Sequence, residues 1–220
     1  MINPPFQAII FDLDGTLIDT IEDLANTVNQ LLSNHQLPLH SIDAYRIKVG
    51  DGIQKLIERS LPSNTPQNND FIQILMEEFK NEYQKNWKQK THPYPGIMQM
   101  LHDLERQSIK KGILSNKPQH FTDLCVKHFF PEVSFDLVRG AQKGIPHKPD
   151  PLSALDIATS FEVDPGRVIY VGDTAIDMQT AVNAGMYAVG VEWGFRDRKE
   201  LIEHGAQAVL QSPKELILLI

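Results

Sequence analysis

The stretch QAIIFDLDGTL, residues 7–17, decides the fold of this chain. Its apolar run, residues 8–11, predicts a buried strand that is covered on both faces, as the strands of a parallel sheet are. Two carboxylates follow directly, at Asp12 and Asp14. Ligands of open α/β sheets bind just beyond the carboxyl ends of the strands, so we expect both side chains to lie at a binding site.

Asp12 and Asp14 stand one residue apart, and such carboxylates repel each other unless a positive charge neutralises them. A hard divalent cation such as Mg²⁺ takes carboxylate and other oxygen ligands and keeps several water molecules. The simpler alternative is an Asp-rich turn that contains a glycine. The position of Asp-x-Asp-Gly-Thr directly after a buried strand favours the metal site.

The motif FDLDGTLIDT, residues 11–20, resembles the opening signature of the haloacid dehalogenase superfamily of phosphohydrolases. The resemblance implies an aspartyl-phosphate mechanism, with Asp12 as nucleophile and Asp14 as general acid and then general base. It also implies that Asp14 touches the metal through its backbone carbonyl, so that its side chain stays free for proton transfer. Pumps of the same superfamily carry Thr at the second position, so Asp14 favours hydrolysis.

The composition limits the possible partners. The chain has 220 residues, 41% of them hydrophobic, enough to bury a core as one domain or as one domain plus an insertion. A net charge of −7 argues against broad binding to nucleic acid or an anionic membrane. No apolar run approaches the roughly 20 residues of a membrane span. The single Cys125 and a start (residues 1–5) unlike a signal peptide predict a cytoplasmic location.

Residues 18–90 are expected to form an all-helical segment. Apolar residues at helical spacing predict helices over about 20–36, 53–61 and 70–87, with no strand among them. In the last of these helices, large apolar side chains recur every fourth residue: Phe71, Leu75, Phe79, Tyr83 and Trp87. This stripe is more typical of the interior of a helical bundle than of a binding surface.

Strands alternate with helices after Pro93 and Gly96, which predicts a parallel sheet with helices on both faces. The predicted strands of this part are 111–114, 135–138, 167–171 and 188–191. The expected fold is therefore a doubly wound, Rossmann-like α/β core, residues 1–17 and 91–220. An all-helical cap domain, residues 18–90, is inserted after the first strand, where it would act as a lid over the site.

Two polar motifs of the second part have the residues of a phosphate site. Ser115-Asn116-Lys117 lies between a strand and a helix, where a hydroxyl and backbone N–H groups suit a phosphate, although a simple helix cap has the same pattern. The prolines around Lys148 stiffen its backbone, so its ammonium can offset charge on Asp12 and on a phosphoryl group. Both motifs resemble those of the superfamily, which implies that Ser115, Asn116 and Lys148 bind phosphate.

The stretch VIYVGDTAID, residues 168–177, is the second acidic strand end. Asp173 emerges where a metal would be shared with Asp12, and Asp177 follows one helical turn later. The spacing resembles the fourth motif of the superfamily, which implies Asp173 as a direct metal ligand and Asp177 as the holder of metal-bound water. An acid that stabilises the start of a helix is an equally good interpretation of Asp177.

All four motifs occur in order, and the chain most resembles phosphoglycolate phosphatases and their relatives with a helical cap. This closer resemblance rests on the length of the cap and on the stretches KVGDG, 48–52, and GVEWGFR, 190–196. Lys48 is the candidate substrate residue of the cap, because it is a cation beside a glycine-flanked turn. A plain helix–helix turn explains the glycines equally well, and Trp193 and Phe195 are expected to pack.

We therefore expect a Mg²⁺-dependent phosphatase that acts on a small phosphorylated metabolite such as 2-phosphoglycolate. A mutase similar to β-phosphoglucomutase, or a pyrophosphatase of the same superfamily, is the alternative within this class. A phospho-accepting signalling module is a more distant one, against which Asp14 and the inserted cap argue. The sequence does not decide between a monomer and a homodimer.

Overall fold

The computed structural model of the chain describes residues 6–63, 65, 68–107 and 109–220. Residues 1–5, which begin the predicted core and carried the signal-peptide argument, lie outside the described residues. Six strands form a parallel sheet in the order β5-β4-β1-β6-β7-β8. Their bounds are β1 Ala8–Phe11, β4 Lys110–Pro118, β5 Leu137–Ala141, β6 Val168–Gly172, β7 Tyr187–Val191 and β8 Ala208–Leu210.

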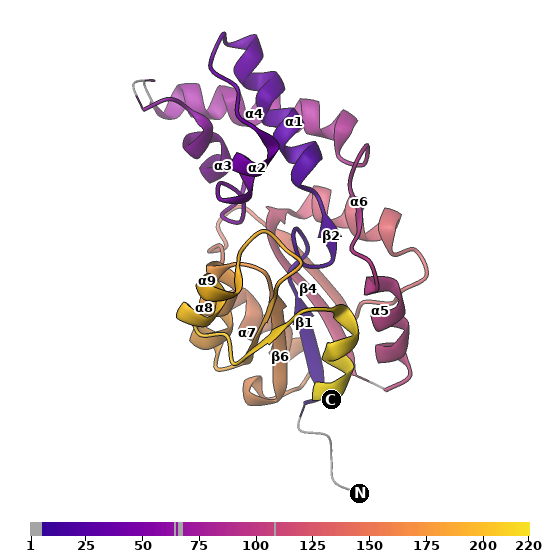
Figure 1. The fold of residues 1–220 in the computed structure, drawn as a ribbon. Helices are drawn as coiled ribbons and strands as arrows, with labels where there is room; N and C mark the ends of the chain where they lie inside the picture. The colour runs from indigo at the N-terminus through magenta and orange to yellow at the C-terminus, as the bar shows by residue number, and fades with distance from the viewer. Residues whose placement is uncertain (1–5, 64, 66–67, 108) are drawn as a thin grey trace, which may run out of the picture.

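Helices cover both faces of this sheet (Figure 1). They are α5 Ile97–Glu105, α6 Gln119–Phe129, α7 Leu152–Ser160, α8 Ala175–Ala184 and α9 Arg198–Glu203, with 3-10 turns at Pro165–Arg167 and Pro213–Leu219. Successive residues of β1 point to opposite faces, so Ile9 packs in one hydrophobic cluster with α5 and α6, and Ile10 in another with α7 and α8. The doubly wound α/β fold expected from the apolar run is confirmed.

Four helices form a cap that enters and leaves the core through a short pair of strands. The helices are α1 Ile21–Asn34, α2 Ile42–Arg46, α3 Ile53–Ser60 and α4 Asn69–Asn86. The strands β2, Ile18–Asp19, and β3, His92–Pro93, pair antiparallel. Figure 1 shows the cap at one end of the molecule, with the start of β1 and the C-terminus at the other. The expectation of no strand in 18–90 was wrong at β2, because two residues are too few to show a period-2 pattern.

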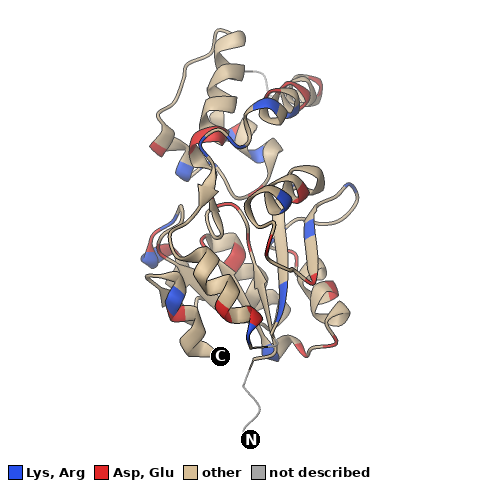
Figure 2. Ribbon diagram, turned by 90° about the vertical axis from the view of Figure 1, so that its right-hand side faces the viewer, with Lys and Arg blue, Asp and Glu red and all other residues tan. Residues whose placement is uncertain are grey.

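The buried carboxylate of Asp23 closes the base of the cap. It accepts hydrogen bonds from the backbone N–H of Lys90, and from both the N–H and the hydroxyl of Thr91. The first turn of α1 is thereby tied to the segment that leads back into β3. Figure 2 shows that acidic and basic residues intermingle along the helices. Within the described residues, no helix combines the length and apolar character that a bilayer span requires.

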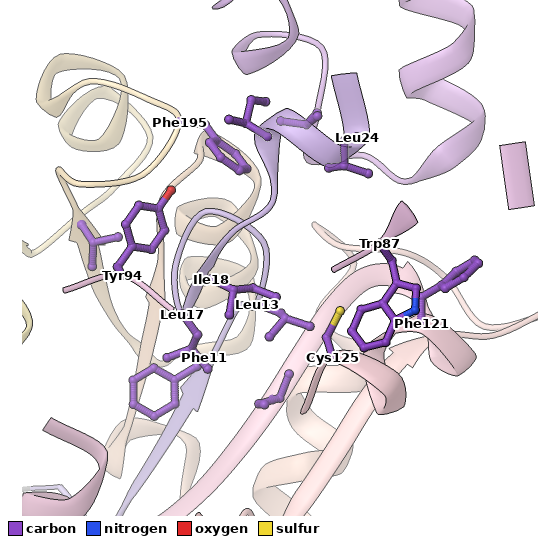
Figure 3. Close-up of a cluster of buried hydrophobic side chains, with 14 of the residues drawn as sticks. Phe11, Leu13, Leu17, Ile18, Leu24, Trp87, Tyr94, Phe121, Cys125 and Phe195 are labelled. Carbon is purple, nitrogen blue, oxygen red and sulfur yellow. The ribbon is translucent and has the colours of Figure 1, made fainter. Parts of the chain in front are cut away.

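One hydrophobic cluster runs from the sheet into the cap. Figure 3 shows Phe11 of β1 and Phe121 of α6 in the same cluster as Leu24 of α1 and Trp87 at the end of α4. Cys125 is part of this cluster, and burial raises the pKa of its thiol to about 12. Its thiol is therefore neutral at physiological pH and serves as a packing group.

Candidate active site

Three buried carboxylates meet at the carboxyl ends of β1 and β6. Asp12 follows β1 and Asp173 follows β6, and these neighbouring strands pair in register, with Phe11 opposite Val171. Asp177 reaches the same point from the first turn of α8. Oxygen atoms of the three carboxylates all lie within 4.8 Å of one another. The fold thus brings together acidic residues that are more than 150 positions apart in the chain.

Lys148 lies against this acidic cluster, which we define as Asp12, Asp173 and Asp177. Its buried Nζ is 2.9 Å from Asp12 Oδ1 and 2.7 Å from Asp177 Oδ1. Burial by itself lowers the pKa of Lys148, but the charges of Asp12 and Asp177 outweigh it, so the pKa is raised and the ammonium stays charged. One ammonium cannot neutralise three carboxylates.

The electrostatics of the acidic cluster fit a divalent cation. Burial, together with the charge of Asp177, raises the pKa of Asp12 to about 7 against the opposing effect of Lys148. Burial and the two neighbouring carboxylates raise the pKa of Asp173 well above its usual value. The buried Oδ1 of Asp12 accepts no well-directed hydrogen bond from the described residues, despite its closeness to Lys148. Hard oxygen ligands with excess negative charge are what Mg²⁺ prefers.

The carboxylate of Asp173 is held in one orientation. Its Oδ1 accepts a hydrogen bond of 3.0 Å from Thr16 Oγ1, and its Oδ2 accepts one of 2.8 Å from the N–H of Phe195. Gly15 and Gly194 press against it so closely that a Cβ on either would collide with its side chain. The stretch 190–196, in which Trp193 and Phe195 were expected to pack, therefore also orients a member of the acidic cluster through its backbone.

Asp177 stabilises the start of a helix, one of the two interpretations that the sequence left open, and its other oxygen faces the acidic cluster. Its Oδ2 accepts hydrogen bonds from the N–H and the hydroxyl of Thr174, at 3.1 and 2.7 Å, and so stabilises the start of α8. Its Oδ1 faces the acidic cluster and accepts from Lys148. One side chain thus caps a helix and fixes the position of the ammonium.

The Ser115-Asn116-Lys117 motif leaves the regular strand ladder, because the register of β4 against β5 shifts between Leu114 and Pro118. The side-chain amide of Asn116 donates to the carbonyls of Gly50 and Lys148, at 3.0 and 3.2 Å, and accepts from the Lys148 N–H at 3.0 Å. Asn116 thus clamps the Lys148 loop to the cap, and these bonds occupy its side-chain amide. Ser115 is buried beside it.

Lys117 is the site residue that sequence reasoning missed. Its Nζ donates to both oxygens of Asp14, at 2.9 and 3.0 Å, and to the hydroxyl of Tyr83 on α4, at 2.9 Å. Burial lowers the pKa of Lys117, but Asp14 and Tyr83 outweigh it, and the pKa is raised. Its place in the motif was the only available signal, since the contact to Tyr83 depends on how the cap sits.

A cavity of about 50 Å³ opens between the acidic cluster and the cap. Its lining comprises Asp12, Asp14, Ser115, Asn116, Lys117, Pro118 and Phe121 of the core, and Leu24, Val49, Gly50, Gly52, Ile53, Leu56, Phe79 and Tyr83 of the cap. The interpretation of the aromatic stripe as bundle interior is incomplete for Phe79 and Tyr83, which are buried in the hydrophobic cluster and also line the cavity. A helical period shows which face is covered, not what covers it.

The loop at 48–52 contributes its backbone to the wall of the cavity. Gly50 and Gly52 line the cavity with φ of 119° and 85°, a turn geometry that favours glycine. Lys48 does not line the cavity, and its Nζ donates to the carbonyl of Arg59 at 2.6 Å. Two arginines join this part of the cap to the core: Arg46 donates to the Gly194 carbonyl and Arg196 to the Val49 carbonyl.

Comparisons with a family model, with related sequences and with solved structures point to the same group of proteins. Residues 9–191 match a family model described as haloacid dehalogenase-like hydrolase. The chain is 31% identical to a phosphoglycolate phosphatase of Nitrosospira multiformis, over 98% of this chain and 96% of the relative. It is 29% identical to an N-acetylmuramic acid 6-phosphate phosphatase of Pseudomonas aeruginosa, over 96% and 93%. In fold it is similar to the crystal structure of a predicted phosphoglycolate phosphatase from Haemophilus somnus, with a TM-score of 0.90, 24% identity and 98% of each chain covered.

Proposed function

The chain belongs to the haloacid dehalogenase-like hydrolase family, and on this premise we propose that it is a Mg²⁺-dependent phosphatase of a small phosphorylated metabolite. The observation that carries the proposal is the acidic cluster with Lys148 at the ends of β1 and β6. In this proposal, residues 1–17 and 91–220 are the catalytic core, residues 18–90 are the cap, and the reduced Cys125 is consistent with work in the cytoplasm.

The acidic cluster would hold the cation. Asp12 and Asp173 would supply carboxylate oxygens, Asp14 its backbone carbonyl, and Asp177 would hold a water molecule of the cation. When bound, Mg²⁺ neutralises phosphoryl oxygens and balances the excess charge of the carboxylates. Lys148 remains beside Asp12, where its ammonium offsets the charge that the approaching phosphoryl group brings.

The protein's own groups then supply nucleophile, acid and base. A carboxylate oxygen of Asp12 attacks phosphorus, and the bond from phosphorus to the ester oxygen breaks. The carboxyl group of Asp14 gives its proton to the departing oxygen. Asp14 then accepts a proton from water, the water attacks phosphorus, and phosphate leaves while the Asp12 carboxylate is restored. In this proposal, Ser115 and the backbone of Asn116 would bind the phosphoryl oxygens.

The cap favours the proposal of a small substrate. Its apolar residues line the cavity together with Asp12, so they would exclude water during phosphoryl transfer. The names of the phosphatases of Nitrosospira multiformis and Pseudomonas aeruginosa both denote a phosphate ester of a carboxylic acid. We therefore propose 2-phosphoglycolate, or a metabolite like it, as the substrate.

The test is phosphate release from a panel of phosphorylated metabolites, with Mg²⁺ and with excess chelator. We expect release by the wild type with Mg²⁺ only, and none by Asp12→Asn. The matched control is Asp156→Asn, a change at an exposed carboxylate paired with Arg139. Equal rates in all conditions overturn the proposal. An isomerised sugar phosphate without free phosphate indicates a mutase, and preference for pyrophosphate indicates a pyrophosphatase.

A further inference from the structure

We propose that Lys117 of the core and Tyr83 of the cap together bind a carboxylate of the substrate. This pair would make the enzyme selective for phosphate esters that bear a carboxylate a short distance from the ester oxygen. The inference rests on the proposed function and deepens it, because it names the groups that choose the substrate.

Charge is the first observation. Among the described residues that line the cavity, Lys117 is the only one with a cationic side chain. Its side chain is 3% exposed, and apolar residues of α1, α3 and α4 form much of the wall around it. A carboxylate that enters such a space loses its water and needs a charged, hydrogen-bonding partner there. Lys117 is the partner that the cavity offers.

Donor capacity is the second observation. An ammonium group has three N–H donors. Lys117 Nζ directs two of them at the Asp14 oxygens, at 2.9 and 3.0 Å, and the third at Tyr83. A ligand carboxylate can take the place of one Asp14 oxygen, since Asp14 then keeps a hydrogen bond to Lys117 through the other. Tyr83 accepts from Lys117, and burial, with Asp14 adding to it and Lys117 opposing, raises its pKa, so its hydroxyl keeps a hydrogen to donate.

Position is the third observation. Lys117 touches Asp14, the proposed acid that protonates the departing oxygen, and is two residues from Ser115, the proposed phosphate ligand. A group bound at Lys117 therefore lies on the leaving-group side of the ester. The start of α6 follows at Gln119, directly after Pro118 of the cavity wall, and a helix start adds favourable potential for an anion.

Three other cations, Lys48, Arg46 and Arg196, do not line the cavity. The Nζ of Lys48 donates to the Arg59 carbonyl, and Arg46 and Arg196 Nη2 donate to carbonyls that join cap and core, while the buried Nη1 of Arg196 has no hydrogen-bond partner among the described residues. Lys148 faces Asp12 and Asp177. Recognition of a second acidic group is thus assigned to Lys117, and it requires the cap, because Tyr83 lies on α4.

The first experiment needs only the wild-type enzyme. It compares inhibition by 3-phosphonopropionate and by propylphosphonate, which have the same length but differ in the carboxylate. We expect the acid to inhibit at a concentration about tenfold to a hundredfold lower, the range for a charged hydrogen bond. Equal inhibition by the two compounds overturns the inference.

The second experiment measures kcat/KM for 2-phosphoglycolate and for ethyl phosphate, and takes the ratio of the two. Lys117→Met should lower this ratio about tenfold to a hundredfold, mainly through KM for phosphoglycolate, and Lys117→Arg should restore most of it. The matched control is Lys80→Met, a lysine on the exposed side of α4 paired with Glu77, which should keep the wild-type ratio.

The outcomes separate this inference from the proposed function. If Lys117→Met slows both esters equally, Lys117 acts only by positioning Asp14, and the inference is wrong. If the wild type hydrolyses neither these esters nor p-nitrophenyl phosphate with Mg²⁺, the proposed function itself fails. Should Lys117→Met not fold, the pair of phosphonates still decides the question on the wild type.

Discussion

Two groups of polar side chains lie at the cavity, and they differ in where their members come from. The acidic cluster and Lys148 belong entirely to the core, at the ends of β1 and β6, at the start of α8 and in the loop before α7. The second group, Asp14, Lys117 and Tyr83, joins the core to α4 of the cap. We therefore assign the proposed chemistry to the core, and the proposed selection of substrate to the contact between the core and α4 of the cap.

The two groups also differ in charge balance. Around Lys148, three carboxylates face one ammonium, an excess that a divalent cation would remove. Around Lys117, one carboxylate faces one ammonium, and a neutral hydroxyl completes the group. Changes in the first group should therefore affect every substrate, and changes in the second should affect substrates unequally.

Asp12→Asn should have the largest effect. It removes the proposed nucleophile, so kcat should fall by about 10⁴-fold or more for every phosphate ester. Phosphate release under saturating substrate measures this. Retention of a tenth of the wild-type rate would mean that the nucleophile is another residue. The acidic cluster would then not be the site of the chemistry.

Asp173→Asn should weaken the cation site. The amide keeps the size of the carboxylate, and its oxygen can still accept from the Phe195 N–H, but one negative charge is lost. We expect the Mg²⁺ concentration for half-maximal activity to rise by at least about 100-fold, alike for all substrates. Calorimetric titration with Mg²⁺ checks the same change without turnover. Unchanged affinity would show that Asp173 is not a ligand.

Asn116→Ala should remove a link between the core and the cap, because the side-chain amide of Asn116 binds both the Lys148 loop and Gly50 of the cap. The loss leaves buried backbone groups without a partner, so the free energy of unfolding should fall by about 1–3 kcal/mol. Denaturant unfolding followed by tryptophan fluorescence measures it. Asn183→Ala is the control, since that amide makes a single exposed bond to the Pro149 carbonyl. Equal losses in the two variants would deny Asn116 its clamping role.

Tyr83→Phe should have a smaller and selective effect. It keeps the ring in the cavity wall and removes the hydroxyl that accepts from Lys117. We expect KM for 2-phosphoglycolate to rise about threefold to tenfold, the range for one neutral hydrogen bond, with a smaller change for ethyl phosphate. An equal change for both esters would mean that the hydroxyl matters only for packing.

Lys48→Ala should have the smallest effect. Its ammonium binds the Arg59 carbonyl within the cap, so we expect kcat/KM for the best substrate to stay within about threefold of the wild type. A tenfold loss would return Lys48 to the role of substrate residue that the sequence predicted. It would also shift substrate selection from Lys117 to the loop at 48–52.

The sequence predicted the fold and the position of the acidic cluster because both depend on local patterns. An apolar run shows a buried strand, and a polar residue after it lies at the carboxyl edge of the sheet, which places Asp12, Ser115 and Asp173 together once the sheet is parallel. Lys148 was found because prolines and its motif single it out. The chemical roles of these four residues, Asp12, Ser115, Lys148 and Asp173, remain proposals.

The missed features depend on contacts between segments distant in sequence. No local pattern shows that Tyr83 of the cap meets Lys117 of the core, or that Asn116 binds Gly50. The aromatic stripe of α4 was assigned to the bundle interior for the same reason, since a cavity wall and a core have the same helical period. The group formed by Asp14, Lys117 and Tyr83 could therefore be identified only from the three-dimensional structure.

A crystal structure grown with Mg²⁺ and beryllium trifluoride tests the central claim most directly, because beryllium trifluoride mimics a phosphoryl group on a carboxylate. The predicted result is one cation that contacts both Asp12 and Asp173, at about 2.0–2.1 Å from their oxygens, with the fluoride adduct on Asp12. A cation elsewhere, or an adduct on another residue, would contradict the account.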